Sequence, residues 1–144
     1  MIVDVPIKVR YAETDQMGVV YHANYLLYME DARTAFLEAA GYPYAQMEEL
    51  GYLSPVVDAH LHYGSPLRYG DTVIVRTRVI SNRPTKTTYA YEFYTQGMDL
   101  ENDRPLATAE STHCIVEADG FKPTSIKRAL PELYALYDTL VEPA

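Results

Sequence analysis

The 144-residue sequence has a single cysteine, no tryptophan and no long apolar run. Because Cys114 stands alone, a disulfide within the chain and a zinc site built from several cysteines are both excluded. No stretch approaches the roughly 20 apolar residues that a membrane-spanning helix needs, so no membrane insertion is expected. The first residues carry no secretion signal, which predicts a cytoplasmic location.

Positive charge is also scarce. Lysine and arginine total 12 against 20 aspartates and glutamates, which gives a net charge of −8. This balance disfavours nucleic-acid binding, which needs a basic surface to replace the counterions of the phosphates. An anionic ligand would therefore need a local basic patch. The clearest candidates are Arg83 and Lys86, which flank a Pro-Thr pair in a predicted turn, although a solvated turn explains them equally well.

The composition is that of a folded protein, with 48% hydrophobic and 22% charged residues. The length predicts one domain over residues 1–144, with one core. Hydrophobic periodicity predicts a helix from about Asn24 to Ala40, with Asn24 as its N-cap and Gly41 as its stop. Alternating and β-branched stretches predict five strands, and a second helix closes the chain. The predicted strands cover about 3–9, 56–63, 72–80, 85–96 and 105–116, and the closing helix covers 131–141. This order predicts an α+β fold in which one long helix packs on an antiparallel sheet.

The segment before the long helix contains the strongest functional signal. Asp15 lies in a polar loop that ends at Gly18, a few residues before the predicted helix start. The free N–H groups and the positive dipole end of a helix start suit a developing oxyanion. Taken alone, the same four residues also fit an ordinary turn in which the aspartate bonds to its own backbone.

The residues around this loop extend the signal. The stretch Thr14-Asp15-Gln16-Met17-Gly18-Val19-Val20-Tyr21-His22-Ala23-Asn24-Tyr25-Leu26, followed by Glu30-Asp31-Ala32-Arg33-Thr34, resembles the 4-hydroxybenzoyl-CoA thioesterase family, in particular its bacterial acyl-CoA thioesterase branch. The resemblance implies a hotdog fold, a five-stranded antiparallel sheet wrapped around one long central helix, with a C-terminal helix added. It implies hydrolysis of an acyl-CoA to a carboxylic acid and free CoA, with the CoA thioester as substrate and no metal or other cofactor. Gln16 and Met17 depart from the small residues that many relatives carry there, which affects the expected shape of the acyl pocket.

The resemblance also implies roles for individual residues. Asp15 would be the nucleophile or the general base, and the backbone N–H of His22 would polarise the thioester carbonyl. Gly18 would let the backbone pass close to the thioester. The other residues expected to contact substrate are Val20, Tyr21, Tyr25, Glu30 from across a subunit interface, and Arg83 and Lys86 at the CoA phosphates. Because sites in this family lie between subunits, a homodimer or homotetramer is expected.

Other functions remain open at this point. A hotdog protein can bind an acyl thioester or an acyl carrier protein without turnover, and an enoyl-CoA hydratase uses the same fold with an Asp/His pair. His60 and His62 share one face of a predicted strand and could bind a metal. No third ligand at a recognisable spacing accompanies them, so hydrogen-bonded structural histidines are the favoured interpretation.

Overall fold

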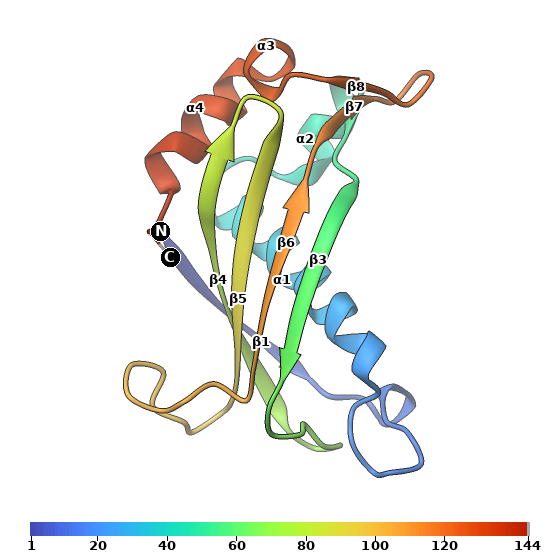
Figure 1. Ribbon diagram of the computed structural model, residues 1–144, viewed down its shortest axis with the longest axis vertical. Coiled ribbons are helices and arrows are strands. Elements are labelled where there is room, and N and C mark those ends of the chain that lie inside the picture. The colour runs from blue at the N-terminus through green and yellow to red at the C-terminus, as the bar shows by residue number, and fades with distance from the viewer. Residues whose placement is uncertain (144) are drawn as a thin grey trace.

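The computed structural model describes residues 1–143. Its centre is a five-stranded antiparallel sheet in the order β1-β4-β5-β6-β3 (Figure 1). The strands are β1 (Ile2–Lys8), β4 (Thr72–Arg83), β5 (Lys86–Thr95), β6 (Ala107–His113) and β3 (Val56–Tyr63). All five predicted strands are present, each within a few residues of its expected bounds.

The helix α1 (Tyr25–Ala39) crosses one face of this sheet. Its buried residues recur at helical spacing and include Tyr28, Met29, Ala32 and Phe36. They meet the alternate residues of the central strands that point inward, such as Val75 on β4. The predicted α+β architecture, a curved antiparallel sheet on one long helix with a C-terminal helix, is confirmed.

The start of α1 differs from the prediction. Asn24 has helical backbone angles and is the last residue of the short 3-10 helix η2 (His22–Asn24), which runs directly into α1. Its side chain makes no capping hydrogen bond to α1 among the described residues. Its side-chain amide instead donates to the Glu13 carbonyl at 2.8 Å. Asn24 therefore stands at the predicted N-cap position but does not cap the helix, because a cap needs extended backbone angles and the backbone of Asn24 is already helical. The predicted stop is confirmed, since Gly41 adopts a φ of +85° just past the last turn.

Smaller elements complete the chain. The helix α2 (Tyr44–Glu49) leads into β2 (Tyr52–Leu53), which joins β7 (Ile115–Glu117) and β8 (Lys122–Thr124) in a second sheet that the sequence did not predict. The helices α3 (Ile126–Ala129) and α4 (Pro131–Leu140) follow, with Pro131 in the first turn of α4 as expected. The chain ends meet, because the amino group of Met1 donates to the Leu140 carbonyl at 2.9 Å.

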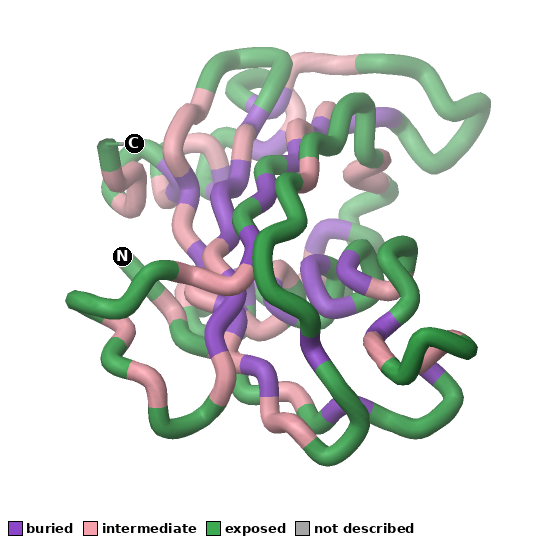
Figure 2. Tube along the Cα trace, turned by 60° about the horizontal axis from the view of Figure 1, so that its bottom comes forward, coloured by how far each residue is buried: buried purple, intermediate pink, exposed green. Residues whose placement is uncertain are grey.

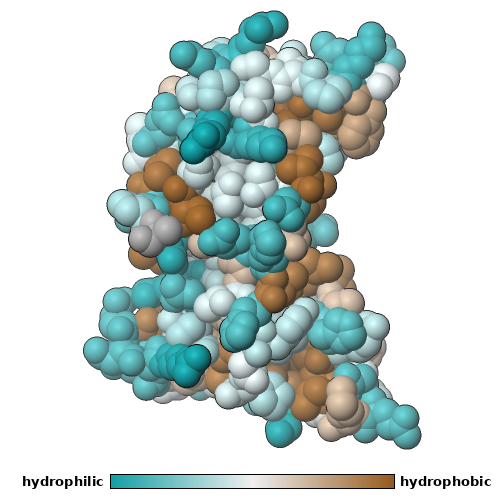
Figure 3. Space-filling view, viewed as in Figure 1, coloured by the Kyte–Doolittle hydropathy of each residue, from teal (hydrophilic) through white to brown (hydrophobic). Residues whose placement is uncertain are grey.

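The two faces of the sheet differ in character. The inner residues and the inner side of α1 are buried, whereas β3 is exposed along nearly its whole length (Figure 2). The outer face carries paired charges, including Arg78 with Glu92 at 2.9 Å. Hydrophobic atoms gather along the side where β3 and α1 lie (Figure 3). The exposed large apolar residues include Val56, Val57 and Tyr63 of β3, and Leu26 and Leu27 of α1. No other strand within residues 1–143 pairs with the free edge of β3.

Candidate active site

The Asp15 loop is a closed, ordered turn. Asp15 and Val19 are joined by a backbone hydrogen bond of 2.9 Å, and the Gly18 N–H donates to the Asp15 carbonyl. One carboxylate oxygen, Oδ1 of Asp15, accepts the Met17 N–H at 2.8 Å. The turn that the sequence also allowed is therefore present. It occupies one oxygen of the partly exposed carboxylate and orients the other, Oδ2, so the turn and a chemical role are compatible.

The buried Glu13 anchors this loop to the rest of the chain, a role that the sequence interpretation missed. Its buried carboxylate accepts the backbone N–H of Arg10 at 2.8 Å and the Tyr28 hydroxyl at 3.0 Å. Its carbonyl accepts the Tyr21 N–H at 2.9 Å as well as the Asn24 amide. Burial, and next the hydrogen bond to Glu13, raise the pKa of Tyr28 well above its usual value, so its hydroxyl remains a donor. One residue thus ties the loop to α1.

His22 opens the helical segment beyond the loop. No group among residues 1–143 accepts the backbone N–H of His22, and its carbonyl accepts the hydroxyl of Tyr63 from β3 at 2.8 Å. Its exposed ring lies 4.4 Å from that of Tyr21 and 6.3 Å from that of Tyr63, measured between ring centroids. The free N–H at the start of a helical run is the donor that an oxyanion requires.

The other residues predicted for the site near the loop differ in their exposure to solvent. Gly18 is exposed with a φ of +78°, so the turn itself requires glycine there. Val20 is buried and donates its N–H to the Leu67 carbonyl at 2.8 Å. Tyr21 is exposed beside His22, whereas Tyr25 is only 4% exposed, and its ring packs edge-on against the exposed Tyr63 and the core residue Phe93. Burial raises the pKa of Tyr25.

Glu30, Arg83 and Lys86 lie away from the loop in the same chain. Glu30 is exposed further along α1, at the rim of a cavity described below. Arg83 and Lys86 are paired across the β4–β5 hairpin and line a cleft with Thr88, on the outer face of the sheet. They stand at the end of β4 opposite to Thr72, which pairs with Lys8 just before the loop. One chain therefore brings Asp15, Gly18, Tyr21 and His22 together, but not the two basic residues.

A second polar cluster lies at the other end of β3. A cavity of about 340 Å³ opens between α1, α2, α4 and the start of β3. A chain of side-chain hydrogen bonds runs beside it, from Arg33 Nη1 to the Tyr91 hydroxyl (3.1 Å), to Ser111 Oγ (2.7 Å) and to His113 Nε2 (2.8 Å). Burial, and next the charge of Arg33, lower the pKa of His113 to about 4, so its ring is neutral at pH 7. The alternation of inward residues on β5 and β6 was the available sequence signal for this cluster.

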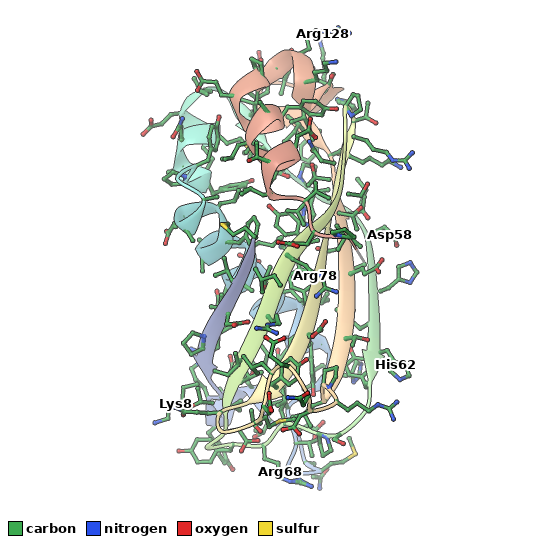
Figure 4. The ribbon with its side chains drawn as sticks, turned by 90° about the vertical axis from the view of Figure 1, so that its left-hand side faces the viewer. Lys8, Asp58, His62, Arg68, Arg78 and Arg128 are labelled. Atoms are coloured by element: carbon green, nitrogen blue, oxygen red, sulfur yellow. The ribbon has the colours of Figure 1, made fainter. Side chains whose placement is uncertain are left out.

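The paired histidines of β3 are exposed. His60 and His62 share the outer face of the strand, and His60 Nε2 lies 3.3 Å from Asp58 Oδ2. Asp58 and His62 project away from the helices (Figure 4). In the part of the chain that the structure describes, no three His, Cys, Asp or Glu side chains lie close enough together to hold a metal ion. No helix of residues 1–143 is long and apolar enough to cross a membrane.

The architecture and the ordered carboxylate before the central helix define a hotdog protein with a candidate hydrolytic site. The sequence model of the thioesterase-like superfamily matches residues 9–134, and the chain belongs to that family. The chain is 44% identical over 132 residues to a Bacillus subtilis protein named "Putative acyl-CoA thioesterase YneP", covering 92% of both chains. It is 29% identical over 127 residues to the acyl-CoA thioester hydrolase YbgC of Escherichia coli O6:H1, covering 88% of both.

Solved structures give the same assignment of fold. The DHNA-CoA thioesterase of Staphylococcus aureus superposes with a TM-score of 0.88 at 33% identity, over 96% of this chain and 89% of that one. The Staphylococcus aureus protein SAV2348, solved in complex with CoA, superposes with a TM-score of 0.80 at 15% identity, covering 100% of this chain and 88% of the other. At that identity the second likeness concerns the fold alone.

Proposed function

We propose that this protein hydrolyses an acyl-CoA thioester to a carboxylic acid and free CoA, with Asp15 as the catalytic carboxylate. The observation that carries the proposal is the Asp15 turn. It holds one carboxylate oxygen against the Met17 N–H and directs the group outward, a few residues before the unpaired N–H of His22. The names of the Bacillus relative, "Putative acyl-CoA thioesterase YneP", and of the Escherichia relative, "Acyl-CoA thioester hydrolase YbgC", support the same reaction.

The reaction needs two protein groups. In one version Asp15 attacks the thioester carbon and expels the CoA thiolate, which takes a proton from water, and water then hydrolyses the mixed anhydride. In the other version Asp15 accepts a proton from the water that attacks directly. In both, the carbonyl oxygen becomes negative, and the His22 N–H stabilises that charge. Val20 and Gly18 shape the backbone path between the two groups, while Tyr21 flanks the opening.

The proposal includes a homodimer, or a homotetramer built from such dimers. The free edge of β3 carries unpaired backbone groups beside exposed Val56, Val57 and Tyr63. Such an edge in a stable protein is normally covered. A second copy covers it symmetrically when the two β3 strands pair antiparallel about a twofold axis. Size-exclusion chromatography with light scattering tests this, and a monomer at micromolar concentration would contradict it.

Arg83 and Lys86 remain the candidates for the CoA phosphates. Since they lie at the far end of the sheet from Asp15 in their own chain, they would serve a site on another subunit. Replacing both by methionine should raise KM for acyl-CoA while leaving kcat nearly unchanged, and should leave the KM for an acyl-pantetheine, which lacks the nucleotide, unaltered. Equal effects on both substrates would remove these residues from the proposal.

A hydratase is the second candidate, and the geometry favours it less. That chemistry uses an Asp/His pair, whereas no hydrogen bond joins the side chains of Asp15 and His22 in the described residues. Release of free thiol from a panel of aromatic, short and long acyl-CoAs, compared between wild type and Asp15→Asn, separates the possibilities. Loss of a general base costs roughly 10²–10⁴-fold in kcat. Asp119→Asn, in an exposed turn, is the matched control.

The outcomes discriminate clearly. Thiol release that collapses in Asp15→Asn, but not in Asp119→Asn, supports the thioesterase. Binding of acyl-CoA without turnover in the wild type would instead support an acyl-thioester or acyl-carrier binding protein. Consumption of crotonyl-CoA by hydration, with no free thiol, would support the hydratase.

A further inference from the structure

The cavity at the Val56 end of β3 contains an arginine without a carboxylate partner. Arg33 is half-buried, and the only hydrogen bond of its side chain in the described chain goes from Nη1 to the Tyr91 hydroxyl. No aspartate or glutamate within residues 1–143 forms an ion pair with it, not even Glu30, one turn earlier on α1 at the cavity rim. A guanidinium has five N–H donors arranged to grip a carboxylate in two places. Most of these donors are therefore available to a ligand.

The groups beside Arg33 fix its position and remain neutral. The hydroxyl of Tyr91, the hydroxyl of Ser111 and the ring of His113 form one continuous chain of hydrogen bonds. His113 is 4% exposed and also bonds to the backbone of Ser54. The hydroxyls of Tyr89 and Tyr137 bond to each other at 2.8 Å in the wall of the cavity. The cavity thus has one cation, the carboxylate of Glu30 at its rim, and a lining that is otherwise aromatic, aliphatic or neutral polar, at a volume typical of a small-ligand site.

The position of the cavity relates it to the Asp15 loop of another copy. Ser54, Pro55 and Val56 line the cavity at one end of β3, while Tyr63 at the other end bonds to His22. These ends are about 23 Å apart for a strand of this length. When two β3 strands pair antiparallel, the Val56 end of one lies beside the Tyr63 end of the other. The cavity then faces the partner's Asp15 loop rather than its own.

We propose that this cavity receives the acyl group bound at the Asp15 loop of the neighbouring subunit, and that Arg33 selects acyl-CoA substrates whose acyl group ends in a carboxylate. The proposal rests on the proposed thioesterase function and its dimer. Arg33 is then a specificity-determining residue, and the distal carboxylate supplies the anionic partner that residues 1–143 of its own chain do not provide. The aromatic lining accepts the carbon skeleton between the two ends of the acyl group.

The first test compares matched substrates that differ only in the distal carboxylate, namely 4-carboxybenzoyl-CoA with benzoyl-CoA, and glutaryl-CoA with valeryl-CoA. The wild type should prefer the carboxylated member of at least one pair in kcat/KM. Arg33→Met should lower kcat/KM for that member by about 10- to 100-fold, the range expected for a charged hydrogen bond, and change the neutral member little. Arg33→Lys should restore part of the preference. Arg78→Met, on the outer face, is the matched control.

A binding arm separates this inference from the proposed function. Asp15→Asn is expected to bind both members of a pair without turnover, so calorimetry on it measures recognition alone. Binding of the carboxylated ester that weakens on adding Arg33→Met supports the inference even if the wild type hydrolyses nothing. Equal affinity for both esters, or a preference that survives Arg33→Met in a protein with an unchanged melting temperature, overturns it.

A mixed dimer tests the contribution of the neighbouring subunit. An Asp15→Asn chain and an Arg33→Met chain, carrying different tags and purified as the heterodimer, contain one site that combines an intact Asp15 with the other chain's intact Arg33. Such a dimer should recover about half of the wild-type turnover of the carboxylated substrate, because one of its two sites is complete. Turnover no higher than that of the Arg33→Met homodimer would show that the cavity serves its own chain, and would overturn the proposal.

Discussion

The candidate functional groups at the two ends of β3 are positioned by different kinds of hydrogen bond. At the Tyr63 end, the Asp15 loop is fixed mainly by backbone hydrogen bonds and by the buried Glu13, and its candidate reactive groups are exposed. At the Val56 end, the polar side chains are buried and bond to one another from Arg33 to His113. A carboxylate held by its own turn keeps an oxygen free for chemistry, whereas hydroxyls that bond to one another fix the shape of a cavity. Four predictions test this difference, from the largest expected effect to the smallest.

The largest effect is the pH dependence of stability at the cavity end. Burial, followed by the charge of Arg33, lowers the pKa of His113 to about 4, below its ordinary value of 6.5. The unfolded chain therefore binds a proton at a pH where the folded chain does not. The contribution of the neutral His113 to the free energy of unfolding is complete above pH 6.5. It is lost as the pH falls toward 4, by about 3 kcal/mol in total.

Urea denaturation of wild type and His113→Gln between pH 7 and pH 4 measures this contribution. As the pH falls, the unfolding free energy of the wild type should decrease more than that of the variant. Parallel profiles would mean that His113 titrates normally.

The second effect is on the anchor of the catalytic end. Glu13→Ala leaves the Arg10 N–H and the Tyr28 hydroxyl without their buried acceptor, which should lower the unfolding free energy by about 2 kcal/mol. Because the same residue positions the loop, kcat should fall as well. Glu13→Gln retains an acceptor oxygen and should lose less of both. A Glu13→Ala protein with normal kcat would show that the loop does not depend on this anchor.

The third prediction compares two glycines in order to separate the effect of backbone strain on stability from the effect of the Asp15 turn on catalysis. Gly18 and Gly41 have φ values of +78° and +85°, and an added Cβ would meet nothing within 4 Å at either position. Each Gly→Ala change should therefore cost about 1 kcal/mol through backbone strain alone. Only Gly18→Ala should also lower kcat/KM, because only that turn orients Asp15. Equal kinetics for the two variants would contradict the role of the turn.

The smallest effect concerns the link between β3 and the loop. Tyr63→Phe removes the 2.8 Å hydrogen bond to the His22 carbonyl, at a cost of about 0.5–1 kcal/mol in thermal or urea unfolding. A modest fall in kcat with little change in KM is expected, since the His22 segment loses one restraint. Tyr94→Phe, which loses a hydroxyl bonded to Glu92 on the outer face, is the control for stability. A larger kinetic effect in the control would refute this link.

Local patterns predicted the strands, the central helix and its glycine stop, since alternation and helical spacing are properties of neighbouring residues. The motif from Thr14 to Tyr25 also located the candidate loop. Two kinds of error remained. Asn24 stands at the N-cap position without capping its helix, and its side-chain amide donates instead to the Glu13 carbonyl, eleven residues earlier. The small sheet of β2, β7 and β8 joins segments some 60 residues apart, and its strands are too short to show a period.

The sequence by itself therefore determined the class of fold and the loop that contains the candidate carboxylate, because both depend on short-range spacing. Only the tertiary structure placed Arg33, Tyr91, Ser111 and His113 in one hydrogen-bonded chain, since these residues come from a helix and two strands and are separated by as many as 80 positions. It also showed Tyr25 in the core, and Arg83 and Lys86 at the opposite end of the sheet from Asp15. Proximity created by folding depends on strand order and register, and neither is visible in a local pattern.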